Sequence, residues 1–276
     1  MAIRIIQSKQ NARVKELRAA LLHPGRGESG LVALEGIHLL AEAIRSGLKP
    51  RTVFVTDNYA HLLGEFKLPP STEVLSLTAE VLASAVTTES PQPVAALLTP
   101  HLWDWPDLLS SDRLLVVLAG IQDPGNLGAI LRSAEAFGAT GAICLPGTVS
   151  PWNPKAMRAS AGSVFRVPLI AASVENCFDR LHKAGVQTLA AMAREAQPLE
   201  EANLAGPIAL FIGSEGSGLA PELAAACDGR ITIPCPGPVE SLNAAVAASV
   251  LLYEAFRQRS QVQKSQIRKS RARRKS

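Results

Sequence analysis

The sequence is poor in aromatic residues and has no long apolar run. Phe, Trp and Tyr make up 4% of the 276 residues, which leaves few side chains for the base-stacking surfaces of many single-strand-binding proteins. Apolar runs such as Leu114–Ala119 are far too short to cross a bilayer. The first nine residues contain no long apolar stretch before a cleavage site, so we expect no secretion signal.

Cysteine is also scarce, and the four cysteines are widely spaced: Cys144, Cys177, Cys227 and Cys235. They form no C-x-x-C pair and no Cys/His cluster with the spacing of a zinc site, so the sequence predicts no metal. Three of them adjoin apolar stretches and are interpreted as small core residues. This usage favours a reducing, cytoplasmic environment.

Acidic residues are missing from the C-terminal end of the chain, where positive charge gathers. Residues 1–26 carry a net charge of +5 and residues 259–276 a net charge of +8, so the body between them carries −9. An acidic body with basic ends indicates an anionic partner, for which nucleic acid is the leading candidate. A disordered extension that only improves solubility has the same composition.

The chain is long enough for two domains, and its hydrophobic content of 47% is typical of a globular protein. Short strand-like and helix-like runs alternate through residues 1–105, which we predict to be a small α/β domain. Residues 100–111 hold two prolines, two tryptophans and few periodic positions, and we place a linker at 106–112. Strands and helices then alternate regularly through residues 113–259, which predicts a parallel sheet with helices on both faces. The basic residues 260–276 are predicted to be a disordered tail.

Three segments of the second domain lie where apolar runs meet predicted helices, which is where α/β proteins place binding groups. They are Asn126-Leu-Gly-Ala-Ile-Leu-Arg132, Gly213-Ser-Glu-Gly-Ser-Gly218 and Glu240-Ser-Leu-Asn243. Asn126 is interpreted either as a residue that orients the first loop or as an ordinary helix N-cap. Glycines at 213, 216 and 218 permit positive φ and close approach of a ligand, although a plain glycine-rich turn would have the same sequence.

With their flanking residues, the three segments resemble the signature motifs of the SpoU/TrmH family of RNA 2′-O-ribose methyltransferases, within the SPOUT superfamily. The resemblance covers about residues 114–256, and Ala244-Ala245 departs from it, since many members carry a larger residue and a serine there. The first domain is similar, on Leu34-Glu-Gly36 and the basic opening helix, to the small ribosomal-protein-like RNA-binding domain that often precedes this catalytic domain.

The resemblance implies a C-terminal SPOUT α/β domain with a deep trefoil knot, a rare exception to ordinary chain connections. It also implies a homodimer with active sites near the subunit interface, and S-adenosylmethionine as methyl donor. Ribosomal RNA is the expected substrate, with transfer RNA second.

The resemblance assigns Arg132 to activation of the ribose hydroxyl. A guanidinium stays protonated at neutral pH, so we favour Arg132 as an electrostatic stabiliser of the developing alkoxide, with a desolvated Arg132 acting as base as the alternative. An arginine on an ordinary helix surface would read the same in sequence. Glu215 is expected to hold Arg132 or to position substrate.

Ser241 and Asn243 are candidate caps of the last helix, and the resemblance adds roles near donor and substrate. It further suggests that backbone groups of Gly213, Ile233 and Leu242 clasp the adenine and ribose of the donor, with Gly218 in the same loop. Without the resemblance, Ile233 and Leu242 would read as core residues.

Two competing functions have distinct signatures. A nucleotide-dependent oxidoreductase is disfavoured, because the glycines at 213–218 do not follow G-x-G-x-x-G and lie late in the fold. A non-catalytic RNA-binding or ribosome-assembly protein of the same fold would not need Arg132, Glu215, Ser241 and Asn243 together.

Overall fold

The computed structural model describes residues 3–25, 30–88, 90–110 and 112–273, with side chains described as far as residue 265. The chain divides into two compact units. Unit 1 comprises residues 1–102 and 150–166, and unit 2 comprises residues 103–149 and 167–276. Segment 150–166, with helix α6 (Pro154–Ala159), therefore packs with unit 1, although its place in the sequence predicts that it belongs to the second domain.

Unit 1 is built on a five-stranded mixed sheet in the order β1-β4-β3-β5-β2. The strands are β1 (Ile3–Ile6), β2 (Val32–Glu35), β3 (Pro50–Thr56), β4 (Glu73–Leu77) and β5 (Val94–Leu98). Strands β1, β3 and β4 pair in parallel, and β5 pairs antiparallel with β2 and β3. Edge strand β1 is not predicted from the sequence, because its burial pattern leaves only Ile6 in the core.

Helices cover the sheet of unit 1 through their apolar positions. Helix α1 (Ala12–Leu22) and helix α3 (Ala79–Ala83) bury side chains such as Val14 and Leu82 in one cluster with alternate residues of the strands. Helix α2 (Ile37–Arg45) packs on β2 and β5. A 3-10 segment, η1 (Asp57–Glu65), follows β3.

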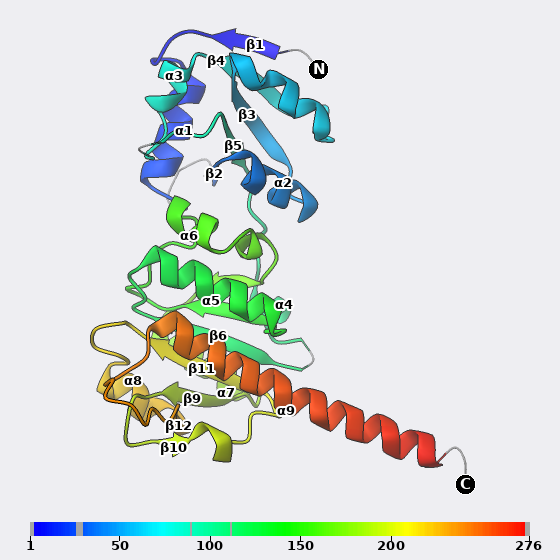
Figure 1. Cartoon of the computed structure of the whole chain (residues 1–276), viewed down its shortest axis with the longest axis vertical. Helices are drawn as coiled ribbons and strands as arrows, with labels where there is room; N and C mark the ends of the chain where they lie inside the picture. Colours follow the sequence, from blue (N-terminus) through cyan, green and yellow to red (C-terminus); the bar gives the residue numbers. More distant parts are fainter. Residues whose placement is uncertain (1–2, 26–29, 89, 111, 274–276) are drawn as a thin grey trace. The chain divides into compact units, whose positions relative to one another are not determined.

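Unit 2 contains a seven-stranded sheet in the order β10-β12-β9-β11-β6-β7-β8, in which every pairing is parallel (Figure 1). The strands are β6 (Leu114–Ala119), β7 (Gly141–Cys144), β8 (Leu169–Ala171), β9 (Gln187–Ala191), β10 (Gln197–Pro198), β11 (Ile208–Gly213) and β12 (Gly229–Thr232). The prediction of a parallel α/β sheet is thus confirmed. A 3-10 segment, η2 (Ser163–Phe165), precedes the short edge strand β8.

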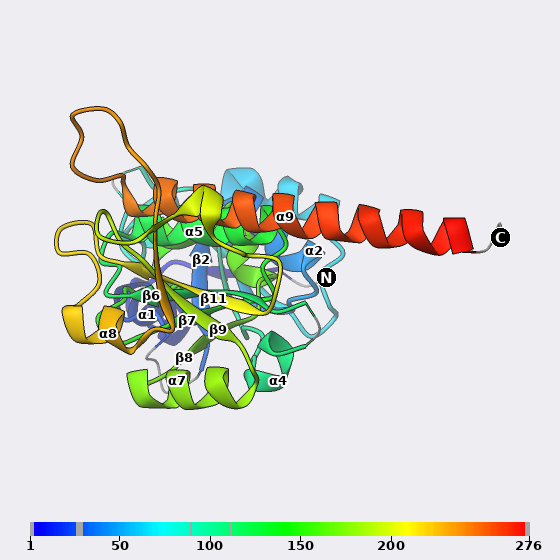
Figure 2. The same cartoon turned by 90° about the horizontal axis from the view of Figure 1, so that it is seen from below.

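Helices lie on both faces of this sheet, as Figure 2 shows. One face carries α5 (Pro124–Ala136) and the start of α9 (Ala244–Arg273), and the other carries α7 (Val174–Lys183) and α4 (Trp105–Leu108), with α8 (Pro221–Ala226) joining the same core cluster. Alternate residues of β6 serve the two faces, with Leu115 and Val117 in the α7 cluster.

The segment predicted as a linker, 106–112, is not free. It contains most of α4, whose Leu108 is fully buried in the core of unit 2. Asp104 and Asp107 form a capping box that starts the helix, and Trp105 also packs in the core. Pro106 argues against a helix when the sequence is read alone. In the structure it occupies the first turn of α4, where proline is tolerated.

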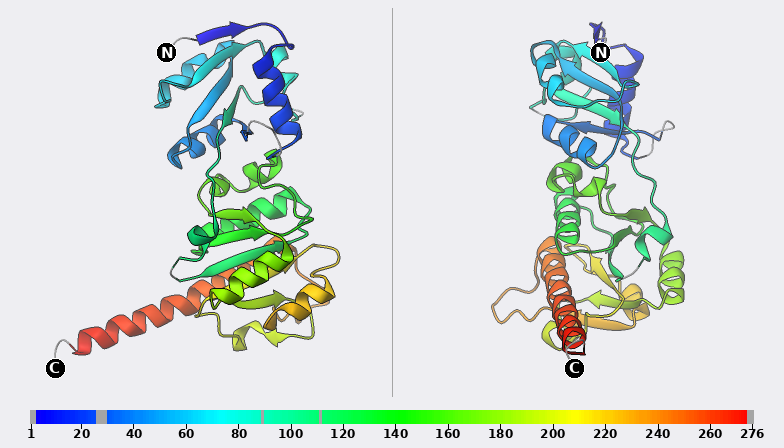
Figure 3. Two further views of the ribbon diagram at one scale, coloured as in Figure 1. Left: turned by 180° about the vertical axis from the view of Figure 1, so that it is seen from behind. Right: turned by 90° about the vertical axis from the view of Figure 1, so that its right-hand side faces the viewer.

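The prediction of a disordered tail at 260–276 is wrong as far as Arg273, because α9 continues to that residue and projects past the sheet (Figure 3). Residues 274–276 lie outside the described chain. Gln258 and Arg259 anchor the helix where it leaves the body: Arg259 donates hydrogen bonds to the carbonyl oxygens of Leu204, Asp112, Arg113 and Gly206. Residues 260–273 contain no Gly or Pro and many Gln, Lys and Arg, so the anchored helix can propagate.

Candidate active site

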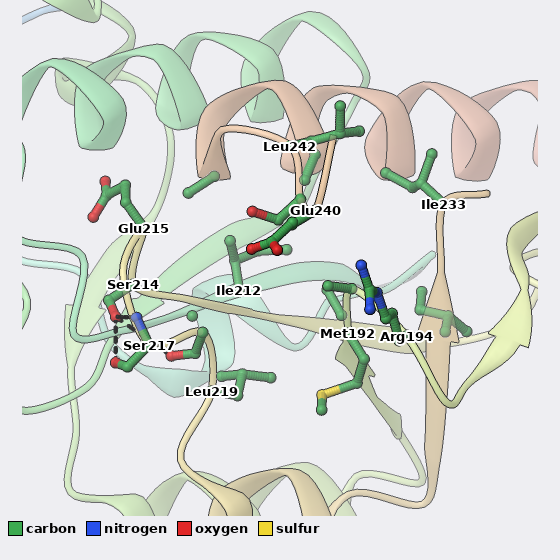
Figure 4. Close-up of a pocket in the computed structure, with 18 of the residues that line it drawn as sticks. Met192, Arg194, Ile212, Ser214, Glu215, Ser217, Leu219, Ile233, Glu240 and Leu242 are labelled. Carbon is green, nitrogen blue, oxygen red and sulfur yellow. Dashed lines mark hydrogen bonds between the residues drawn. The ribbon is translucent and has the colours of Figure 1, made fainter. Parts of the chain in front are cut away.

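The carboxyl ends of three adjacent strands, β12, β9 and β11, open into a cavity of about 570 Å³. Three loops line it: residues 192–195 after β9, 214–219 after β11 and 233–242 after β12. Figure 4 shows side chains from all three loops around the same space. Because strand ends of a parallel sheet share one edge, the fold brings segments together that lie up to 50 residues apart in sequence.

The loop after β11 folds back on its own strand. Ser214 and Gly218 exchange two backbone hydrogen bonds of 3.0 and 3.1 Å, and Gly218 has a φ of +68°. A Cβ on Gly213 would lie 2.2 Å from the carbonyl carbon of Gly218, so only glycine fits at 213. Gly216 has neither a crowded Cβ position nor positive φ, so the positive φ expected there is not adopted.

The cavity lining combines apolar walls with negative charge. Ile233 and Leu242 are half-buried and line it, together with Ile212 and Leu219. Among the described lining residues, Glu195, Glu215 and Glu240 supply three carboxylates and Arg194 the one guanidinium. This lining suits a ligand that has a flat apolar part and net positive charge.

A chain of side-chain hydrogen bonds joins the three sequence motifs at the rim of the cavity. Asn243 donates from Nδ2 to Oδ1 of Asn126 at 3.0 Å, and Asn126 donates from Nδ2 to Oε1 of Glu215. Asn126 lies in the first turn of α5, the helix after β6, and Glu215 lies in the loop after β11. The chain leaves β6 towards β7 on one side of the sheet and leaves β11 towards β12 on the other side. The contact therefore spans a topological switch point, where α/β sheets bind ligands.

The capping roles of the polar motif residues differ from expectation at two positions. The N-cap of α5 is Asp123, whose carboxylate accepts from the Asn126 N–H at 2.9 Å, so the interpretation of Asn126 as an N-cap is wrong. Asn243 caps α9, accepting from the N–H groups of Ala245 and Val246. Ser241 is exposed, lines the cavity and makes no hydrogen bond with the described residues.

Arg132 lies apart from this cavity within one chain. Its side chain is exposed on α5 and forms no hydrogen bond or ion pair with any described residue, and it is absent from the cavity lining. It follows Asn126 by six residues, or about 9 Å of helix rise. The expected contact between Glu215 and Arg132 is not formed, because Glu215 instead accepts from Asn126.

The loop after β9 also lines the site, although the sequence does not predict it. Met192, Arg194 and Glu195 line the cavity, and Glu195 adopts a φ of +55°. No glycine-rich or polar motif marks this loop, and the one available signal is its position after a buried strand of the same sheet. Cys235, for which the sequence predicts no role in the site, also lines the cavity.

No group of three or more His, Cys, Asp or Glu side chains suited to a metal ion occurs among the residues that the structure describes. Nor does any helix in the described ranges have the length and hydropathy needed to span a membrane.

Comparison with known proteins decides the family. The model of the SpoU rRNA Methylase family matches residues 113–253. The chain belongs to this family. A second model, the MRM3-like substrate binding domain, matches residues 11–96. Both matches confirm the resemblance drawn from the three motifs and the α/β fold class, including an N-terminal domain of substrate-binding type.

Relatives match along nearly the whole chain. An uncharacterized tRNA/rRNA methyltransferase of Synechocystis is 36% identical over 92% of this chain and 93% of its own length. The 23S rRNA (guanosine(2553)-2′-O)-methyltransferase RlmP of Bacillus subtilis is 29% identical over 90% of this chain and 97% of its own. Among solved structures, the AdoMet-bound SpoU methyltransferase AviRb of Streptomyces viridochromogenes has a TM-score of 0.81 at 28% identity, covering 91% of this chain and 98% of that one.

Proposed function

We propose that the chain transfers a methyl group from S-adenosylmethionine to the 2′-hydroxyl of a ribose in ribosomal RNA. Membership of a family of rRNA methylases makes it a methyltransferase. The observation that carries the proposal is the convergence of three motif loops on one cavity, tied together through Asn126, Glu215 and Asn243. The names of relatives such as RlmP and the AdoMet-bound neighbour AviRb support the same reaction and donor.

The cavity fits this donor on the chemistry of its lining. Backbone groups of Gly213, Ile233 and Leu242 would hold the adenine and ribose, and the apolar side chains beside them would pack on the purine. Gly218 closes the loop that shapes this wall. The excess of carboxylates in the lining favours a ligand with a sulfonium and an ammonium group.

When bound, the donor supplies an electrophilic methyl on a sulfonium, and the residues of the chain must align and charge-stabilise the attacking oxygen. Arg132 carries a fixed positive charge and has no carboxylate partner among the described residues, so its guanidinium is free to stabilise negative charge on the ribose oxygen. The proton then leaves to a substrate phosphate or water. In the alternative, a desolvated Arg132 accepts the proton itself. Ser241 and Glu215 at the rim position the substrate.

The active unit in this proposal is a homodimer, in which the partner's α5 and α9 bring Arg132 to the cavity. Helices α5 and α9 pack together, with 2.7 Å between the hydroxyls of Ser133 and Ser249. Beside them, Tyr253 and Phe256 are about half exposed and both contact the ring of Phe137. An exposed apolar patch on the helix pair that carries Arg132 is typical of a protein interface.

Mixed dimers separate an Arg132 that acts on the partner's cavity from one that acts on its own. In a mixed dimer of Arg132→Ala and Leu242→Asp chains, the first chain supplies an intact cavity and the second an intact Arg132. These two form a complete site only if Arg132 acts across the interface. We expect each variant alone to be inactive and the mixture to regain activity. A mixture that stays inactive, although mixed dimers form, would place Arg132 in its own subunit's site.

Two further features of the proposal concern topology and location. A deep trefoil knot is supported by the insertion of β12 between β9 and β10 and by the return of α9 to α5. A cytoplasmic location fits four cysteines without a disulfide and a ribosomal substrate.

The substrate RNA separates the remaining alternatives. Ribosomal RNA is favoured by the family and by RlmP, while transfer RNA is the second candidate. Mapping ribose methylations in RNA from cells with and without the protein identifies the nucleotide. Calorimetry with S-adenosylmethionine tests the non-catalytic alternative, since a protein that only binds RNA should show no heat of donor binding.

A further inference from the structure

Unit 1 contains a second cavity, of about 590 Å³, that the proposed transfer reaction does not use. It lies where β2 ends and α2 begins, beside the segment that leads into β5. Its lining includes Glu35, Gly36, His38, Thr88, Gln92 and Arg158, all within the same compact unit. A cavity of this size is in the range of small-molecule sites.

Glu35 gives this cavity an unusual acceptor. Its side chain is only 3% exposed. Oε1 accepts hydrogen bonds from the Thr88 hydroxyl at 2.6 Å and from the Gln92 N–H at 2.7 Å. Oε2 is buried and has no hydrogen-bond partner among the described residues. A buried carboxylate oxygen without a donor is costly, so a ligand that displaces the atoms covering Oε2 and brings an N–H group to it would gain binding free energy.

The start of α2 adds hydrogen-bond donors to the same cavity. Gly36 has a φ of +105° and provides no side-chain cap, so the first N–H groups of this nine-residue helix are not satisfied by a capping side chain. Free N–H groups and the helix dipole favour an anion. Arg158, exposed on α6, adds a cation to the lining.

We propose that this cavity holds an unpaired guanosine of the RNA substrate, an inference that rests on the proposed function. A carboxylate only accepts hydrogen bonds, and the Watson–Crick edge of guanine presents two adjacent donors, N1–H and N2–H. Adenine and cytosine place an acceptor beside their amino group, and uracil flanks its N–H with two acceptors. The phosphate of the same nucleotide is then served by the α2 amino end and Arg158. Single-stranded RNA is commonly read in this way, through the edges of splayed bases.

The test measures binding of full-length protein to four single-stranded RNA pentamers that differ only in the central base, by fluorescence anisotropy. Wild-type protein should bind the guanine pentamer about tenfold more tightly than the adenine pentamer, which corresponds to about 1.4 kcal/mol. Glu35→Gln keeps an oxygen for Thr88 and Gln92 but replaces the unpaired acceptor with an amide donor. In E35Q the guanine preference should disappear or reverse towards adenine.

Glu80→Gln is the matched control, because Glu80 is an exposed carboxylate of the same unit that pairs only with Lys9 among the described residues. It should keep the guanine preference, and thermal unfolding should show both variants folded. Equal wild-type affinity for the four pentamers, or a guanine preference that survives in E35Q, would overturn the proposal. Binding of free GMP as tight as the guanine pentamer would assign the site to a free nucleotide instead.

The outcome is independent of the transfer reaction. E35Q should bind S-adenosylmethionine with wild-type affinity, because Glu35 and the donor cavity lie in different units. Loss of base preference with intact donor binding therefore supports the guanosine site, whereas absent donor binding in wild-type protein would contradict the proposed function alone.

Discussion

Asn243 donates a hydrogen bond from Nδ2 to Oδ1 of Asn126 at 3.0 Å, across 117 positions of sequence. The hydrogen bonds of Asn243 fix the orientation of both side-chain amides. Asn243 must turn its oxygen to the N–H groups of Ala245 and Val246 at the start of α9, so its nitrogen faces Asn126. Asn126 in turn directs its nitrogen to Glu215. The start of α9 therefore sets the direction of the whole chain of hydrogen bonds.

This directionality predicts that Asn126→Asp is more harmful than Asn126→Ala. An aspartate would place a second carboxylate against Glu215 and would have no donor for it, whereas alanine only removes the bonds. We expect single-turnover methylation to fall by roughly 100-fold or more in N126D, in line with about 3 kcal/mol for a broken charged contact. Asn176→Asp, at an exposed position of α7, is the control and should leave the rate unchanged. Equal rates in N126D and N126A would contradict a directional chain of hydrogen bonds.

Arg132→Ala should abolish methylation while donor affinity changes little. The guanidinium is absent from the lining of its own subunit's donor cavity, and in the proposed dimer it faces the ribose oxygen, where negative charge develops during transfer. The substitution should therefore affect the rate constant and not the donor binding constant. Single-turnover kinetics and calorimetry with S-adenosylmethionine measure the two quantities. Arg132→Lys keeps the charge and should retain part of the rate. Near-normal turnover in R132A would discredit the assigned role.

Deleting residues 260–276 should weaken RNA binding and flatten its dependence on salt. The deletion removes seven Lys and Arg residues but leaves the anchor at Arg259. If all seven meet phosphates of single-stranded RNA, the slope of log K against log salt should become less steep by about 5. A variant of full length with these seven residues changed to Gln controls for length. An unchanged slope of log K against log salt would show that the tail does not bind RNA and only improves solubility.

Cys235 should be the reactive thiol of the native protein. Burial raises the pKa of Cys144, Cys177 and Cys227 to about 12, so their thiolates are scarce at pH 8. Cys235 is half-buried and lines the donor cavity. Alkylation at pH 8, followed by mass spectrometry, should modify Cys235 first, and S-adenosylmethionine should slow the modification. Labelling of Cys235 at the same rate with and without donor would place the donor elsewhere.

Much of the catalytic unit follows from local sequence. Runs such as Ile208–Gly213 have no polar residue because both faces of a central parallel strand are covered, and this pattern locates the strands. Glycine at 213 and 218 marks the crowded, positive-φ loop between them. The amino-acid pattern alone is therefore enough to place the three motif loops at strand ends.

Features that depend on tertiary context could not be predicted in this way. The loop after β9 carries no motif, and Arg194 joins the cavity only because β9 lies between β11 and β12. The helical tail depends on the anchor at Arg259, which uses carbonyls of distant loops. The unpaired Oε2 of Glu35 could not be predicted either, because Leu34-Glu-Gly36 has the sequence of an ordinary strand-to-helix junction.

The most direct test of the central claim is nucleoside analysis of RNA methylated in vitro. Ribosomal RNA from cells that lack the protein would be incubated with purified enzyme and S-adenosylmethionine, digested to nucleosides and analysed by mass spectrometry. We expect a single 2′-O-methylated nucleoside that is absent when R132A replaces the enzyme. A methyl group found on a base, or no transfer to any RNA although donor binds, would contradict ribose methylation by this chain.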